Sequence, residues 1–245
     1  MILRKDFLVI VIRLFLGYIF FSSGLSKLTH GQFNQIIGPA FLEDSLAKYG
    51  LAFFARIVAI SQVICGTLVL SQRFSSIGAI VLLPMNLSIL AVTISLNWHG
   101  TPYVVGFFLG LNLLLLVYDW RKLIVIISIA QTSTVKATTL DGYSNNVFNL
   151  FAILFSIAAM IASRYNIFLT SVFALSTFAL IGYSIIQAKA LSKLQTIIVF
   201  LVILNMALIT LANHIIFSKQ MLASNTVIIV LLVVLSLLKI RRLEN

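Results

Sequence analysis

The residues best suited to chemistry in this chain are cations that interrupt or close its long apolar runs. Arg13 begins the stretch RLFLGYIFFSSGLSKL, Lys27 lies near its end, and Arg56 lies near the start of the next run. A charged side chain inside a membrane-type segment is costly, and it commonly marks an ion pair or a functional site. Such cations can hold an anionic or carbonyl-bearing ligand, or they can pair with acids of the same chain.

The composition indicates whether these cations lie in water or in a lipid bilayer. Hydrophobic residues make up 61% of the chain and charged residues 9%, whereas soluble domains carry about 25% charged residues. We therefore expect an all-α, polytopic transmembrane helix bundle in contact with the lipid bilayer. The formal net charge is +11. The cations lie mainly at the ends of the apolar runs, which indicates membrane topology and no nucleic-acid binding.

Cysteine and histidine usage limits the metal and redox chemistry that the chain can do alone. The sequence has one cysteine, Cys65, which excludes an internal disulfide and a CxxC redox pair. The three histidines, His30, His99 and His214, lie near the ends of apolar runs. We therefore expect no metal site, no intramembrane haem and no intrinsic cofactor.

The apolar runs predict the number of helices and the orientation of the chain. Eight candidate spans lie at about residues 7–26, 51–71, 75–96, 103–120, 147–163, 166–187, 195–217 and 224–240. With the N-terminus inside, most Lys and Arg residues lie at the inner ends of these spans. The positive-inside rule then predicts that both termini are cytoplasmic, in the cytoplasmic (inner) membrane of a bacterium.

A change in composition divides the chain. The stretch 131–146, QTSTVKATTLDGYSNN, is polar and shows no apolar periodicity. We expect it to be a cytoplasmic linker between a four-helix membrane bundle at 1–130 and a further four-helix membrane region at 147–245. Polar residues inside apolar runs concentrate in the first region, so we expect any site to lie there.

Helical periodicity indicates which residues face the interior of the bundle. At about 100° per residue, one stripe of the first span contains Arg13, Gly17, Phe20, Gly24 and Lys27. Its glycines would allow another helix to approach closely. On the second span, Arg56 shares a stripe of small residues with Gly66, whereas Gln62 lies about 120° away from Arg56. We therefore expect Arg56, and not Gln62, on the buried face.

An inner polar cluster is expected near the N-terminal end of the first span. Arg13 lies about 10 Å from that end at ~1.5 Å per residue. Asp119 ends the fourth span at the same side of the membrane, so we expect Asp119 to pair with Arg13, with Asp6 as the alternative. Asn112 would complete this cluster.

An outer polar cluster is expected at the opposite end. It contains Lys27, Arg56, Asn86, Asn97 and His99, with Glu43 or Asp44 as the expected ion-pair partner. The candidate ligand-binding residues are these five cluster residues together with Arg13 and Gln62. Two interpretations stay open. The polar residues either lock the helices together, or their surplus cations hold an anionic or carbonyl-bearing ligand such as a lipid headgroup or a quinone.

Several stretches together resemble a known family. These are Arg13-x3-Gly17-x2-Phe20-x3-Gly24-x2-Lys27, Gly38-Pro39-Ala40, the stretch 56–66 with Gln62, and the turn 97–102, NWHGTP. They resemble the DoxX-like family of bacterial membrane proteins over about residues 7–120. The region 147–240 has no counterpart in this resemblance.

The resemblance implies a function as well as a fold. Members are four-helix membrane proteins, and some are linked to quinone reduction or to complexes with soluble oxidoreductases. Many carry a glutamate where Gln62 stands here. The resemblance implies a partner-dependent membrane subunit that binds a quinone or lipid and associates with a soluble or membrane oxidoreductase. The alternatives are a non-catalytic scaffold or assembly factor and a small-molecule or lipid carrier. An enzyme acting alone is the least favoured reading, and an oligomer is compatible with all three.

Overall fold

The computed structural model describes residues 4–34, 37, 45–127, 146–188, 191–213 and 217–244. Glu43, Asp44, His214 and almost the whole expected linker lie outside these residues. The elements of the described part are α1 (Arg4–Leu28), α3 (Ala52–Leu70), α4 (Ser75–Ser95), α5 (Thr101–Tyr118), α6 (Trp120–Ile127), α8 (Val147–Ala162), α9 (Ile167–Gln187), α10 (Lys193–Thr210) and α11 (Ser218–Glu244). The expected all-α fold is confirmed.

The lengths of these helices agree with a membrane bundle. Among the described residues, seven helices are long and apolar enough to cross a membrane, and α8, with 16 residues, is shorter. Each expected span corresponds to a helix, although α10 already ends at Thr210 and α11 already begins at Ser218. The expected polytopic helical bundle is therefore confirmed.

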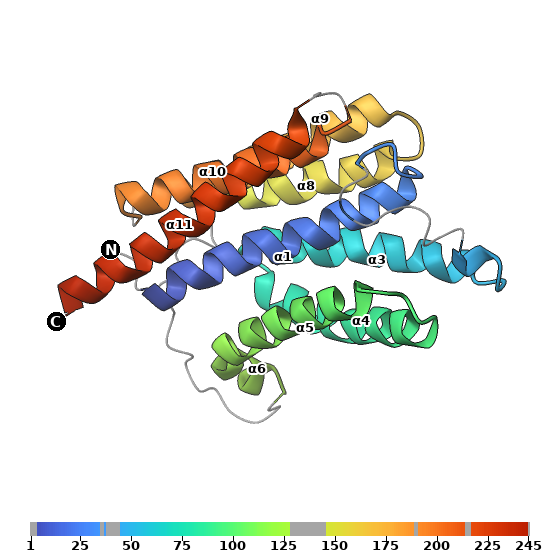
Figure 1. Ribbon diagram of the computed structural model, residues 1–245, viewed down its shortest axis with the longest axis horizontal. Helices are drawn as coiled ribbons and strands as arrows, with labels where there is room; N and C mark the ends of the chain where they lie inside the picture. Colours follow the sequence, from blue (N-terminus) through green and yellow to red (C-terminus); the bar gives the residue numbers. More distant parts are fainter. Residues whose placement is uncertain are drawn as a thin grey trace.

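Helix α1 occupies the centre of the molecule. Figure 1 shows it between helices α8 to α11 on one side and α4 to α6 on the other. The Tyr18 hydroxyl donates to the backbone oxygen of Met206 at 3.0 Å. The Tyr18 and Phe21 rings also pack edge-on against Phe178, with centroids 5.2 and 5.5 Å away. Helix α1 therefore joins the first and second parts of the chain, and the expected boundary between two membrane regions stays a prediction.

Close contact between α1 and α3 depends on glycine, as the stripe of the first span predicted. A Cβ on Gly24 would lie 2.6 Å from the backbone oxygen of Ala59, and one on Gly17 would lie 2.9 Å from that of Gly66. A Cβ on Gly66 would in turn collide with the backbone nitrogen of Phe21. The two helix backbones are thus too close for any larger side chain at these positions.

Asn112 connects α5 to α4 by hydrogen bonds to the α4 backbone, next to Pro84. In the amide orientation that its partners require, it donates to the backbone oxygen of Ala79 at 3.0 Å and accepts from the backbone N–H of Leu83 at 3.1 Å. Pro84 follows immediately and lacks an N–H, so the helix ladder is interrupted there. The expectation that Asn112 joins the inner cluster around Arg13 is wrong, because its amide is used by the α4 backbone.

Candidate functional site

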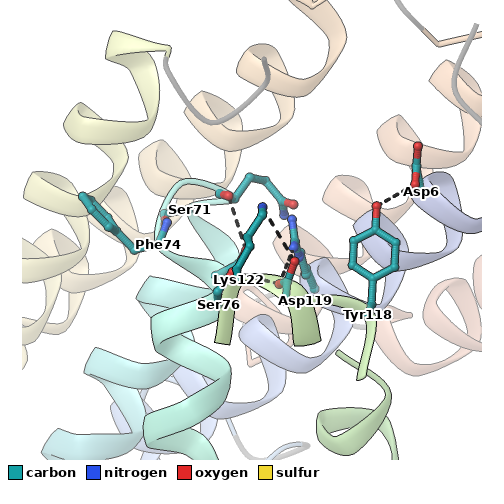
Figure 2. Close-up of polar contacts among 10 residues, drawn as sticks. Asp6, Ser71, Phe74, Ser76, Tyr118, Asp119 and Lys122 are labelled. Atoms are coloured by element: carbon teal, nitrogen blue, oxygen red, sulfur yellow. Dashed lines mark hydrogen bonds and ion pairs between the residues drawn. The ribbon is translucent and has the colours of Figure 1, made fainter. Parts of the chain in front are cut away.

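The end of the bundle at which α1 begins is named the inner end, and the end at which α1 stops is named the outer end. At the inner end, Arg13 Nη2 lies 2.9 Å from Asp119 Oδ2, and the two side chains are only 3% and 2% exposed. Ser76 donates to the same oxygen at 2.8 Å, and Lys122 Nζ lies 3.7 Å from Oδ1. Figure 2 shows Asp119 beside Ser76 and Lys122. The structure thus brings together Arg13 and the acid that the sequence indicated.

Asp6, the alternative partner of Arg13, is used elsewhere. Its Oδ1 accepts a hydrogen bond of 2.6 Å from the Tyr118 hydroxyl, as Figure 2 shows. The Arg13 guanidinium carbon lies 6.0 Å from the centre of the Tyr118 ring. These contacts tie α1 to α5 and to the turn that precedes α6. We interpret the inner cluster as a set of contacts that hold the helices together, because the charge of Arg13 is already neutralised by Asp119.

Arg56 does not lie on the buried face of α3. The buried residues of this helix include Ala55, Ala59, Gln62, Val63 and Gly66, while Arg56 is exposed. The expectation that Arg56 is buried and Gln62 is not is therefore wrong. At about 100° per residue, Arg56 falls at the edge of the stripe of small residues, and the centre of that stripe lies towards Ala55 and Gln62.

Asn97 and His99 are both exposed, in the connection between α4 and α5. Asn97 has a left-handed backbone with φ of 51°, and the Trp98 N–H donates to the Thr93 oxygen at 3.1 Å. This is the geometry of a helix C-cap, a position in which asparagine is well tolerated. The structure thus gives Asn97 a role in ending α4, and it does not bring Asn97 or His99 together with Lys27.

A cavity of about 370 Å³ lies in the outer half of the bundle formed by α1, α3, α4 and α5. Its walls are mainly apolar and include Phe20, Phe54, Val105 and Phe108. Lys27, Gln62 and Asn86 also line it, and so does Trp98 from the connection between α4 and α5. Its volume and its apolar walls with a few polar groups are typical of a small-molecule site.

Lys27 is held at the wall of this cavity by polar neighbours. Its Nζ donates to Ser23 Oγ at 2.6 Å, to Gln62 Oε1 at 3.0 Å and to the Ser23 backbone oxygen at 3.3 Å. The side chain is buried. Ser23 was not among the candidate residues of the sequence analysis. The spacing of four residues between Ser23 and Lys27 was the available signal, because it places both on one face of α1.

Asn86 has the most unusual environment in the cavity. It is fully buried, and neither its Nδ2 nor its Oδ1 has a hydrogen-bond partner among the described residues. Buried polar groups are nearly always paired, because an unpaired amide in an apolar environment costs free energy. Asn86 therefore places an amide nitrogen and an amide oxygen, both without a partner in the described part of the chain, at the wall of an apolar cavity.

Asn86 and Asn112, which are both fully buried in neighbouring helices, give a matched stability prediction. Asn112→Leu removes two hydrogen bonds to α4, so we expect it to lower the free energy of unfolding by about 1–3 kcal/mol. Asn86→Leu removes no hydrogen bond to the described part of the protein, so we expect no comparable loss. Thermal unfolding of both variants in the same detergent measures the difference. Equal destabilisation by the two substitutions would contradict the assignment of partners.

Comparison with known proteins supports the resemblance for part of the chain. Residues 8–95 match the family model described as DoxX. This segment contains Arg13, Lys27, Gln62 and Asn86, and it comprises α1, α3 and α4 almost completely. No curated protein and no solved structure matches the chain. The DoxX match and the long apolar helices identify an integral, multi-pass membrane protein.

Proposed function

We propose that this membrane protein, DoxX-like over residues 8–95, binds a small amphipathic molecule in the outer cavity. The ligand has a head that carries carbonyl or anionic oxygen, as in a quinone or a lipid headgroup, and an apolar remainder. The observation that carries the proposal is Asn86, a fully buried amide without a partner in the described part of the chain, at the wall of a cavity.

The polar side of the cavity suits such a head. Lys27 supplies a positive charge that is held in place by Ser23 and Gln62. An oxygen atom that carries negative charge or a strong dipole is stabilised beside an ammonium group in a low-dielectric environment. The Nδ2 of Asn86 adds a hydrogen-bond donor. Arg13 and Arg56 have no part in this proposal, since Arg13 is paired with Asp119 and Arg56 is exposed.

The apolar side of the cavity suits the remainder of the molecule. Phe20, Phe108 and Val105 provide aromatic and branched walls. Phe54 and Val104 also line the cavity and are themselves exposed on the outside of the bundle. In a bilayer these positions would contact acyl chains, so a ligand could enter from the lipid phase. Burial of its apolar surface against the walls supplies the larger part of the binding free energy.

We further propose that the protein is a partner-dependent subunit in the inner membrane of a bacterium, with both termini in the cytoplasm. The concentration of Lys and Arg at the inner helix ends supports this orientation. With one cysteine and three histidines, the chain has few groups with which to hold a redox centre. In this proposal an oxidoreductase partner supplies the redox chemistry, and the membrane subunit presents the quinone or lipid.

Native mass spectrometry of the gently solubilised protein tests the binding proposal. We expect the wild type to carry an adduct whose occupancy falls about tenfold in Asn86→Leu, since hydrogen bonds to the amide are lost. Ser88→Ala is the matched control, because Ser88 lines the same cavity but its hydroxyl already donates to the Pro84 oxygen at 2.8 Å.

Extraction of the adduct into organic solvent distinguishes its sources. A quinone is identified by its ultraviolet spectrum and by the spectral change on reduction, and a phospholipid is identified by its phosphorus content. A wild-type protein that carries no adduct, or one whose adduct is unchanged in Asn86→Leu, would overturn the proposal. It would favour the scaffold alternative.

A further inference from the structure

We infer that the outer cavity selects ligands whose head group donates a hydrogen bond, such as a hydroxyl, over ligands that only accept. The inference rests on the proposed function, because it concerns the same cavity. It follows from which polar atoms around the cavity are already used within the protein.

The ammonium of Lys27 is largely committed. It has three N–H donors, and Ser23 Oγ, the Ser23 backbone oxygen and Gln62 Oε1 lie between 2.6 and 3.3 Å away. The two side-chain oxygens are in turn occupied as acceptors. Lys27 therefore contributes positive charge to the cavity. Because its N–H groups are already used, it does little to discriminate between ligand head groups by hydrogen bonding.

Two hydroxyls at the cavity, on α4, are committed as well. The Thr93 hydroxyl donates to the Leu90 oxygen at 2.9 Å, and the Ser88 hydroxyl donates to the Pro84 oxygen at 2.8 Å. Both bonds stay within α4. Asn86, on the same helix, has the amide group whose donor and acceptor both lack a partner among the described residues.

A primary amide can discriminate between ligand head groups because its nitrogen and its oxygen need different hydrogen-bond partners. The Nδ2 of Asn86 donates, and the Oδ1 accepts. A ligand carbonyl or ether can accept from Nδ2, but it leaves Oδ1 buried and unpaired. A hydroxyl can do both at once, because its oxygen accepts from Nδ2 while its hydrogen is donated to Oδ1 on the same edge of the amide. An apolar, water-poor site increases the penalty for the unpaired atom.

The ligand class that follows is an amphiphile with a free hydroxyl. Among the ligands of the proposed function, the cavity would bind the quinol form more tightly than the quinone form, and a lipid with a free hydroxyl more tightly than a fully esterified one. An unpaired buried acceptor weakens binding by about tenfold in dissociation constant. We therefore expect a preference of this size between two molecules that differ only in the hydroxyl.

The test uses 4-octylphenol and its methyl ether, 4-octylanisole, with the full-length protein in a mild detergent. The two probes share the ring and the chain, but the ether cannot donate. Native mass spectrometry titration gives both dissociation constants. We expect the phenol to bind the wild type and Ser88→Ala about tenfold more tightly than the ether, and Asn86→Leu to bind both equally.

The outcomes separate this inference from the function on which it rests. Equal binding of both probes to the wild type would overturn the hydroxyl preference and leave the proposed cavity ligand intact. A preference that persists in Asn86→Leu would also overturn it, because the extra methyl group of the ether would then be the cause. Binding of neither probe to the wild type would count against the proposed function itself.

Discussion

Asp119→Ala is expected to destabilise the folded bundle by about 3–5 kcal/mol, the range found when one partner of a buried ion pair is removed. The substitution leaves the guanidinium of Arg13 buried and without its carboxylate. It also removes the acceptor of Ser76. Thermal unfolding in detergent and the yield of monodisperse protein measure the loss.

A double variant separates the ion pair from simple packing. Arg13→Met combined with Asp119→Leu removes both charges, so we expect it to recover much of the stability lost in Asp119→Ala. Lys122→Gln is the milder control, because Lys122 lies 3.7 Å from Asp119 Oδ1 and is partly exposed. A double variant no more stable than Asp119→Ala would show that the residues matter through shape and not through charge.

Gly66→Leu is expected to prevent normal packing of α1 on α3, with a loss of at least ~3 kcal/mol or of folded protein altogether. The first carbon of any side chain at this position would meet the backbone of Phe21 and Gly17. A backbone cannot move aside as a flexible side chain can. Size-exclusion chromatography of the detergent-solubilised variant measures the folded fraction.

The matched control for this prediction is Gly106→Leu on α5. A Cβ at Gly106 would meet no atom within 4 Å, and leucine favours helix more than glycine does by roughly 1 kcal/mol. We expect Gly106→Leu to fold at least as well as the wild type. If both substitutions reduced the folded fraction equally, the harm would come from helix propensity or insertion, and the close contact of α1 and α3 would lose its support.

The sequence predicted the inner ion pair because the chain offers few acids that could pair with Arg13. The chain has six acids in all, and a charge at membrane depth needs a partner at the same depth. Asp119 was the acid that ended a span on the side of Arg13. The glycine stripe was predictable for a similar reason, since small residues at helical spacing mark a close helix contact.

The outer site was only half predictable. Lys27, Gln62 and Asn86 were recognised as candidates, and the structure brings all three to one cavity. Arg56 was placed wrongly because it lies at the edge of its helical stripe. At such a position a small rotation of the helix decides whether the side chain faces the interior of the bundle or the bilayer. Asn97 was misread because a polar residue at a helix end can cap the helix, and its backbone angle is not written in the sequence.

The sequence by itself determined that the molecule is a membrane helix bundle and that its buried arginine pairs with an acid of the same chain. A chain this apolar must be a membrane helix bundle, and a buried charge must be neutralised. Only the tertiary structure decided that Asn112 is bonded to α4 while Asn86 is left without a partner in the described part of the chain. The two residues look alike in the sequence, since each is an asparagine in an apolar helix. Their difference arises because hydrogen bonds depend on the position and angle of atoms from other helices, which no pattern along one helix specifies.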